Sequence, residues 1–335
     1  MVQSAGGAEG PPLPKQPRRH LIRQYGPMAT PTLPLTGAQF EITAGDYQAN
    51  ITQLGAGLRS LTVRGQPVVT GYQPDELPPA GAGQLLIPWP NRIDHGRYDF
   101  GGRTHQLDLS EPAHDNAIHG LTRWLTWQLA AHSADSAELT LQLLGRPGYP
   151  FRLDLTARYQ LTQAAGLEVT ITARNTGSRH APFGTGSHPY LRAGTGLADD
   201  WQLQLPAALW QPADTRGIPD GKPQDVTGSA YDFRDIRPIG SAVLDHAFTG
   251  LDTGPDGRAL ARLAGPDTSL ALWAGSGYRW LQVFTGDPLG PAARRRAVAI
   301  EPMTCPPNAF VTGTDLQTIE PGAQVTHSWG IQASG

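Results

Sequence analysis

The sequence contains only one cysteine, Cys305. A single thiol cannot form an internal disulfide, and it cannot supply the cysteine clusters of structural zinc sites. We therefore expect a cytoplasmic protein, since a chain without disulfides fits a reducing compartment. The sequence also lacks a Gly-rich phosphate loop, a nucleotide fingerprint and a His-x-x-x-His pair. No cofactor and no metal are predicted.

The sequence has no excess of basic residues and no long apolar run. Its formal net charge is −3, whereas proteins that bind nucleic acid carry a basic stripe. No apolar run approaches the roughly 20 residues that a membrane-spanning helix needs. We expect neither nucleic acid nor a membrane as a partner. For the assembly we expect a monomer or a weak homodimer.

Glycine and proline are abundant, with 40 and 31 residues, and apolar residues make up 39% of the chain. Both residue types break helix interiors, so this composition favours strands and loops. Residues 1–35 have too few apolar side chains to order themselves and are predicted to be a disordered tail. Met28, near the end of this tail, is a possible translation start. Residues 36–335 are predicted to form a single domain, a length that all-β folds reach as one unit.

Apolar residues alternate with polar ones in many short segments. The clearest are FRLDLTARYQL (151–161) and LEVTITARN (167–175). Period-two alternation is typical of half-buried antiparallel strands, and no repeat of 40 to 50 residues suggests a propeller. We expect an all-β fold, a large antiparallel β-sandwich with no long amphipathic helix. The polar segment 206–242 is either an insertion that lines a site or a mobile flap.

One stretch, Pro88 to Trp127, gathers polar and aromatic residues among glycines and prolines. We expect it to be largely exposed, and exposed loops of this composition usually bind a ligand. Its candidate binding residues are Asn91, Arg92, His119 and, as an aromatic face, Trp89.

Three further candidates follow later in the chain. His188 lies in GSHPYL, between small residues and a strand-forming run, as His119 does in NAIHGL. In AVAIEP, Val298 and Ile300 point to one side, so Glu301 shares the other side with two alanines, which leave room for a ligand. Asp245 is flanked by apolar residues and can accept hydrogen bonds. Hydrogen-bonding groups and aromatic faces together suit a neutral, polyhydroxylated ligand such as a sugar.

An ordered series of motifs runs through the same residues: NRI with GRYDFGG, then NAIHGL, SHPYL, LDHAF and AIEP. This series resembles the aldose 1-epimerase (mutarotase) family over roughly residues 38–332. The resemblance implies a galactose mutarotase-like β-sandwich that interconverts the α and β anomers of a free aldose without a cofactor. PMTCPPNAF after the glutamate and GTGSHPYL depart from galactose-type members, which leaves the identity of the sugar open.

The resemblance also implies a role for each matching residue. Glu301 would be the general base that takes the proton of the C1 hydroxyl, and His188 the general acid that protonates the ring oxygen. Arg92, His119 and Asp245 would hold the substrate. From the residues, we expect the carboxylates of Glu301 and Asp245 to keep His188 positively charged.

Three alternatives remain open. The same fold could serve as a non-catalytic carbohydrate-binding module, because a fold alone does not prove activity. Asp245 and Glu301 could be the two carboxylates of a glycoside hydrolase. The run Arg294–Arg296 could select an anionic sugar, phosphorylated or sulfonated, although such charge runs are usually solvated. Cys305 is expected to be a buried, inert thiol.

Overall fold

The computed structural model describes residue 1, residues 33–266 and residues 268–334. In these ranges the regular structure is almost entirely strands, and the only α-helix, α1, is four residues long. The predicted all-β class is therefore confirmed. Leu33 to Gly335 group into one compact unit. Nearly all of the predicted tail, including Met28, lies outside the described residues, and its boundary stays a prediction.

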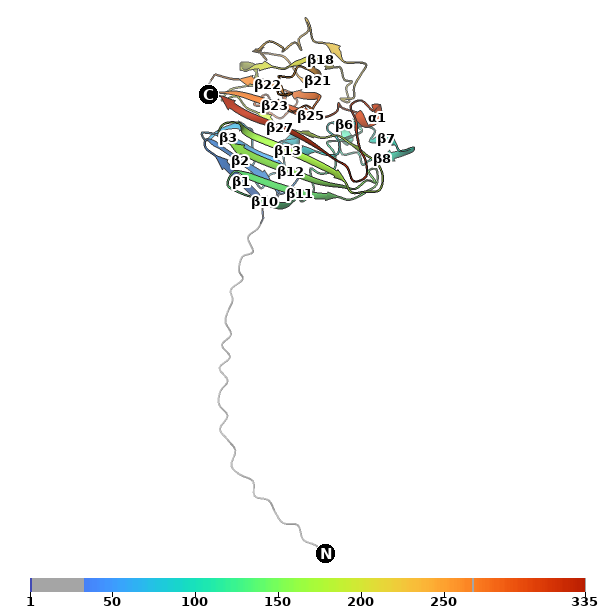
Figure 1. The fold of residues 1–335 in the computed structure, drawn as a ribbon. Coiled ribbons are helices and arrows are strands. Elements are labelled where there is room, and N and C mark those ends of the chain that lie inside the picture. Colours follow the sequence, from blue (N-terminus) through green and yellow to red (C-terminus); the bar gives the residue numbers. More distant parts are fainter. Residues whose placement is uncertain (2–32, 267, 335) are drawn as a thin grey trace. The chain divides into compact units, whose positions relative to one another are not determined.

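Two large antiparallel sheets build this unit (Figure 1). The 12-stranded sheet has the order β1-β2-β3-β4-β16-β25-β24-β21-β18-β19, and β15 and β5 attach to it beside β25. Its strands are β1 (Gln39–Ala44), β2 (Tyr47–Thr52), β3 (Leu58–Val63), β4 (Gln66–Val69), β5 (Leu85–Leu86), β15 (Gly186–Ser187), β16 (Tyr190–Leu191), β18 (Ala207–Gln211), β19 (Gln224–Asp225), β21 (Asp245–Leu251), β24 (Trp280–Phe284) and β25 (Val298–Met303).

The second sheet has nine strands in the order β10-β11-β12-β13-β27-β23-β22-β17-β20. They are β10 (Gln128–His132), β11 (Ser136–Leu143), β12 (Leu153–Thr162), β13 (Gly166–Asn175), β17 (Gln202–Gln204), β20 (Arg237–Pro238), β22 (Ala259–Ala264), β23 (Ser269–Ala274) and β27 (Gln324–Ser334). Small two-stranded sheets and short helices complete the unit: β6 (Arg92–Asp94) with β9 (Asn116–Ile118), β7 (Arg97–Phe100) with β8 (Arg103–Gln106), β14 (Ala181–Phe183) with β26 (Gln317–Ile319), η1 (Pro79–Gly81), η2 (Pro112–His114), η3 (Ala198–Asp200) and α1 (Ala309–Thr312).

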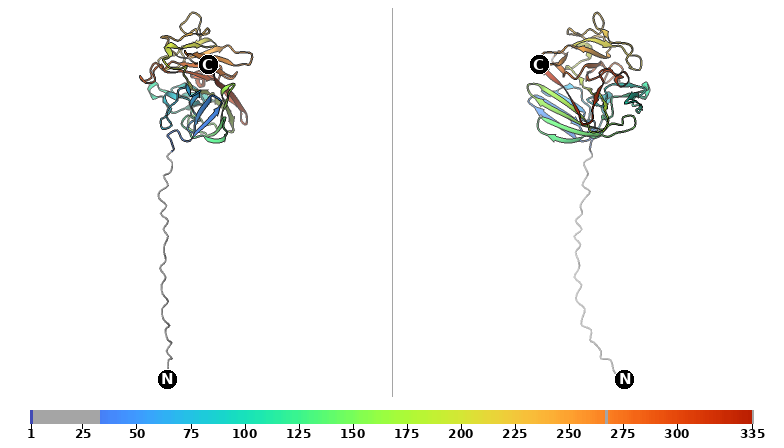
Figure 2. Two further views of the ribbon diagram at one scale, coloured as in Figure 1. Left: turned by 90° about the vertical axis from the view of Figure 1, so that its left-hand side faces the viewer. Right: turned by 45° about the vertical axis from the view of Figure 1, so that its right-hand side comes forward.

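The main core lies between the two sheets. β1 contacts β11 and β12 of the other sheet, and the blue and green strands of Figure 1 show this stacking. On β12, alternate residues from Leu153 to Leu161 are buried, as the period-two pattern predicts. Burying one such leucine contributes about 1.5–3 kcal/mol. Figure 2 shows from two further sides that β18 and β21 lie at the end of the unit opposite β1.

The stretch from Pro88 to Trp127 is not the exposed connection that its composition suggests. Trp89 and Trp127 are almost fully buried, and so are Ile93 and Tyr98. Aromatic rings are large enough to fill core space from a loop, and burying them stabilises that loop. The expectation of a largely exposed stretch is therefore wrong, although its polar residues do reach a cavity.

The segment 206–242 is not a plain loop either. It contributes β18 and β19 to one sheet and β20 to the other. Between β18 and β19 the chain makes a loop, residues 212–223, that returns to the small sheet of β6 and β9, where Asn116 and Arg216 hydrogen-bond each other. The segment is thus built into both large sheets, and its loop packs on the small sheet of β6 and β9.

Candidate active site

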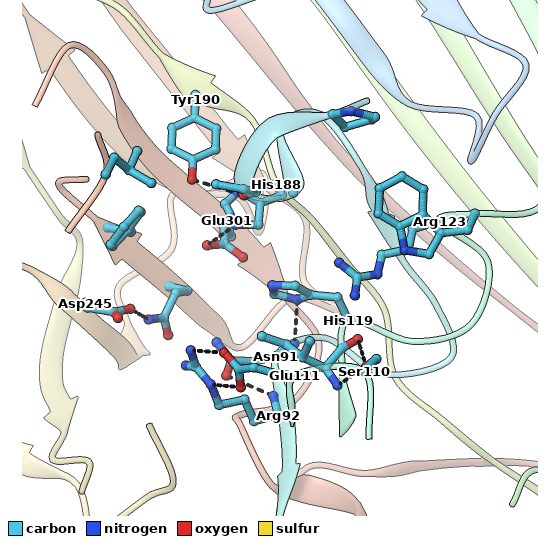
Figure 3. A pocket seen from close by; sticks show the side chains of 18 residues that line it. Asn91, Arg92, Ser110, Glu111, His119, Arg123, His188, Tyr190, Asp245 and Glu301 are labelled. Atoms are coloured by element: carbon cyan, nitrogen blue, oxygen red, sulfur yellow. Dashed lines mark hydrogen bonds and ion pairs between the residues drawn. The ribbon is translucent and has the colours of Figure 1, made fainter. Parts of the chain in front are cut away.

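A cavity of about 340 Å³ opens over strands β24 and β25 of the 12-stranded sheet. This volume is within the range of roughly 300–1,000 Å³ that small-molecule sites occupy. Its walls come from parts of the chain that are far apart in sequence (Figure 3). Six of the predicted site residues line it: Asn91, Arg92, His119, His188, Asp245 and Glu301.

Glu301 lies on the face of β25 that the alternation predicts. Val298 and Ile300 belong to the main core, whereas Ala299 packs in a separate small cluster with Tyr190. Glu301 is 2% exposed and shares this second face. The two faces of one strand thus separate core packing from the cavity.

His188 contacts Glu301 directly. It lies between β15 and β16, and its Nε2 is 3.3 Å from Oε1 of the carboxyl group. The imidazole is 5% exposed and stacks on the ring of Tyr190, with the ring centres 5.0 Å apart. The structure therefore brings together the two residues to which the family resemblance gives the proton transfers.

Burial decides the protonation of this pair. It raises the pKa of Glu301 well above its ordinary value, with the nearby charge of Asp245 acting in the same direction. It lowers the pKa of His188 to about 4. Both shifts favour a neutral acid beside a neutral imidazole. The expectation that carboxylates keep His188 charged is wrong, because desolvation lowers the pKa of the buried ring and a neutral Glu301 exerts no charge attraction on it.

The pair has polar atoms that face no partner within the chain. Among the described residues, none hydrogen-bonds to Oε2 of Glu301 or to Nδ1 of His188, although both atoms are buried. Buried polar atoms in proteins nearly always have a hydrogen-bonding partner. A carboxyl oxygen and a ring nitrogen in this condition suit the hydroxyl groups of a ligand.

His119 has a defined tautomer. The backbone N–H of Asn91 donates to its Nδ1 at 3.2 Å, and the backbone N–H of His119 donates to the Asn91 carbonyl at 2.9 Å. Since Nδ1 accepts, the ring proton of a neutral His119 must be on Nε2. Burial lowers the pKa of His119 well below its ordinary range. His119 is thus a neutral N–H donor at the cavity wall (Figure 3).

Arg92 is held by an acid that the sequence did not single out. Its Nε and Nη2 donate to the two carboxyl oxygens of Glu111, each at 2.8 Å. Asn116, fully buried, donates to the same carboxyl group at 3.2 Å. Glu111 lies inside the stretch already considered, but no local signal pairs it with Arg92. The guanidinium thus reaches the cavity already fixed on one side.

Asp245, at the start of β21, is exposed at the cavity rim. Its Oδ1 accepts a hydrogen bond of 2.8 Å from Gln282. Gln282 on β24 is paired in register with Glu301 on β25, so the strand ladder places this amide between the two acids. Gln282 carries no sequence signal, because its role depends only on strand order.

Trp89 does not line the cavity. It is buried with its ring edge-to-face against Phe310, so the expectation that it offers a face to a sugar is wrong. The exposed aromatic ring at the cavity is Trp124, 45% exposed. Its neighbour Arg123 also lines the cavity, with the guanidinium 5.4 Å from the Trp124 ring centre. The motif LTRWLTW was visible in the sequence, but it did not show which tryptophan faces the cavity.

The run Arg294–Arg296 does not reach the cavity. Arg295 is buried and forms ion pairs with Asp199 at 2.7 Å and with Asp287 at 2.9 Å. Its role is structural, so the run is not a reason to expect an anionic sugar. Cys305 is buried, and burial raises the pKa of its thiol to about 12, as expected for an inert side chain.

Within the described ranges, no group of three or more histidine, cysteine or acidic residues could hold a metal ion. The same part of the chain has no helix of sufficient length and apolar character to cross a membrane.

The two stacked sheets and the polar cavity on one of them define a galactose mutarotase-like β-sandwich. The chain belongs to the aldose 1-epimerase family, whose sequence model, described as "Aldose 1-epimerase", matches residues 38–332. The family resemblance drawn from the motif series is thereby confirmed.

Curated relatives agree with this family. The Escherichia coli K12 protein YihR, described as uncharacterized, is 37% identical over 287 residues, which cover 86% of this chain and 90% of YihR. An aldose 1-epimerase of the same organism is 28% identical over 222 residues, or 61% of this chain and 63% of the relative.

Solved structures share the fold. A GalM/aldose epimerase homologue from C. elegans superposes with a TM-score of 0.78 at 18% identity, covering 89% of this chain and 98% of the homologue. Galactose 1-epimerase from Lactobacillus acidophilus gives 0.75 at 23% identity, covering 88% and 93%. At these identities the likeness establishes the fold alone.

Proposed function

We propose that the protein is an aldose 1-epimerase that interconverts the α and β anomers of a free aldose. The observation that carries this proposal is the buried contact between Glu301 and His188 at the cavity, with Oε2 and Nδ1 facing no protein partner. A base and an acid within reach of one ligand are what anomer exchange needs.

The reaction moves two protons. The carboxylate of Glu301 takes the proton of the C1 hydroxyl while His188 gives a proton to the ring oxygen. The bond between C1 and the ring oxygen breaks, and an open-chain aldehyde forms. After rotation about the C1–C2 bond, the ring closes on the other face and both transfers run in reverse.

The protonation state of Glu301 and His188 is compatible with these proton transfers. A neutral Glu301 beside a neutral His188 holds the same number of protons as a carboxylate beside an imidazolium. Binding of a sugar needs only to move one proton across the 3.3 Å contact. The active charge state therefore requires no proton from solvent, even though burial disfavours it in the free protein.

Three neighbours would orient the sugar. His119 offers a neutral N–H donor, Arg92 offers the guanidinium edge not used by Glu111, and Asp245 offers carboxyl oxygens at the rim. Binding by several hydroxyl contacts places C1 and the ring oxygen against the proton-transfer pair.

The experiment is polarimetry of freshly dissolved α-aldoses, with the protein and without it. We expect the protein to accelerate the change in rotation of at least one sugar. If binding is measured but no sugar is accelerated, the non-catalytic carbohydrate-binding module takes the place of the enzyme. Release of aryl alcohol from an aryl glycoside would instead favour a glycoside hydrolase.

A second candidate is a mutarotase for an anionic sugar, and Arg123 favours it. Among the described residues, no side chain forms a hydrogen bond or an ion pair with its guanidinium, although the group lines the cavity and is partly buried. Burial lowers the pKa of Arg123, as expected for a cation short of a counter-ion. A phosphate or sulfonate on the sugar could supply that charge. Adding aldoses with an anionic group on the carbon outside the ring to the panel tests this candidate.

A further inference from the structure

We propose that the loop formed by residues 212–223, between β18 and β19, positions the guanidinium of Arg92. Arg216 anchors this positioning loop, and Gly217 is the residue of the loop that lies against Arg92. The inference rests on the proposed function, because it concerns how a sugar-binding group is held.

Arg216 ties the loop to the small sheet that carries Arg92. Its Nη2 lies 2.7 Å from the carboxyl group of Asp94 and donates to Oδ1 of Asn116 at 3.0 Å. Its Nε donates to the carbonyl of His114 at 2.9 Å. These bonds join residues that are about 100 positions apart in the sequence, and they hold the loop against β6 and β9.

Asn116 links the loop to the counter-ion of Arg92. Its buried Nδ2 donates to the backbone carbonyl of Arg216 at 2.9 Å and to the Glu111 carboxyl group at 3.2 Å. One amide therefore holds both the loop and the acid that binds Arg92. A shift of the loop would therefore also displace the Glu111 carboxyl group, since the members of a buried hydrogen-bond network depend on one another.

Gly217 lies directly against Arg92. A Cβ atom at this position would be 2.4 Å from Nη1 and 2.7 Å from Cζ of the guanidinium. Gly217 also has a φ of 73°, in the left-handed region that favours glycine. Asp214 shapes the turn, because its Oδ1 accepts from the backbone N–H of Arg216 at 2.8 Å and of Ile218 at 2.9 Å.

Arg92 has little room to move away from the loop. The space between the loop and Arg92, beside Asp245 and Gln282, is a cavity of about 10 Å³, which is about the volume of one water probe. On its other side Arg92 is bound by both oxygens of Glu111. A side chain at position 217 must therefore displace the guanidinium or break the pair with Glu111. Either change misplaces a group that is proposed to bind substrate.

The test compares Gly217→Ala with Gly221→Ala. Both glycines belong to the positioning loop and have similar positive φ values, 73° and 79°. A Cβ at Gly221 meets nothing within 4 Å, so both variants carry the same backbone strain and only one presses on Arg92. We expect Gly217→Ala to raise KM about tenfold and to change kcat less than about twofold, since it removes binding common to substrate and transition state. Gly221→Ala should leave both parameters unchanged.

A double-mutant cycle shows whether Gly217 acts through Arg92. In an Arg92→Ala background, Gly217→Ala should no longer change KM, because the group it displaces is absent. Equal KM values for the two glycine variants, or a full effect of Gly217→Ala without Arg92, would overturn the inference.

The same variants separate this inference from the proposed function. If the wild-type protein accelerates no aldose, the proposed function fails. Calorimetric titration with the sugars of the panel then gives dissociation constants in place of KM, and the expected pattern is the same: weaker binding for Gly217→Ala than for Gly221→Ala. Equal dissociation constants, or binding of no sugar by the wild-type protein, would overturn the inference.

Discussion

At the scale of single residues, the candidate site depends on burial. Glu301 and His188 are ordinary titratable groups whose neutral forms are favoured because little water reaches them. The two groups are 3.3 Å apart, so a proton can pass directly from one to the other. Sugar hydroxyl groups that satisfy Oε2 and Nδ1 would stabilise the charged arrangement that the proposed reaction needs.

Glu301→Gln tests the proposed base. Glutamine has the same shape but cannot take a proton, so turnover should fall by about a hundredfold or more. Binding of the sugar should remain within a few-fold of wild type. The thermal midpoint at neutral pH should not fall, because the change removes a buried ionisable group. Polarimetry and calorimetry measure the two effects, and near-wild-type mutarotation would remove Glu301 from the mechanism.

Arg123→Met tests the second candidate function. Methionine fills similar space without the charge, so KM for a sugar with an anionic substituent should rise at least about tenfold, as expected for a lost charged hydrogen bond. KM for neutral sugars should not change. The matched control is Arg294→Met, which removes an exposed arginine that does not line the cavity. If the two variants have the same KM for the anionic sugar, an anion site at Arg123 is excluded.

At the scale of elements, strand pairing brings together polar side chains that are far apart in the sequence. Gln282 reaches Asp245 from β24, and its register partner on β25 is Glu301. These strands bring three polar side chains to one cavity while their other faces pack in the main core. On the second sheet, β12 has the same division between a buried and a solvent-facing side.

Leu155→Ala tests the division on β12. Leu155 is 1% exposed, so its truncation should lower the free energy of unfolding by about 2–5 kcal/mol. Arg158→Ala changes an exposed residue of the same strand and should stay within about 0.5 kcal/mol of wild type. Urea denaturation measures both. Similar losses for the two variants would contradict the assignment of the faces.

At the scale of the whole molecule, several histidines are buried in a neutral form. His327 on β27 is 8% exposed, and its Nε2 lies 3.0 Å from Gln317. Burial lowers the pKa of His327, and also that of His246 and His119. His327 and His246 lie on strands of the two large sheets, and His119 directly follows β9 at the cavity. Acid therefore acts on the fold at several places.

We therefore expect acid to destabilise the protein. A histidine with a lowered folded pKa takes up its proton first in the unfolded chain, so its contribution to stability is lost as pH falls below the unfolded pKa of about 6.5. The thermal midpoint should drop between about pH 6.5 and 4. His327→Gln, which lies outside the cavity lining, should make this drop shallower. An unchanged pH dependence in that variant would contradict the assignment of His327.

The sequence by itself determined the strands, the all-β class and the face on which Glu301 lies, because the period of two is a local property of an extended backbone. The ordered motifs also identified the family. Only the tertiary structure decided which side chains meet. Glu301 contacts His188, Glu111 binds Arg92, Gly217 lies against that arginine, and Trp124 rather than Trp89 faces the cavity. These contacts depend on strand order and loop packing between distant segments, and burial then set the charge of His188, which its sequence neighbours could not show.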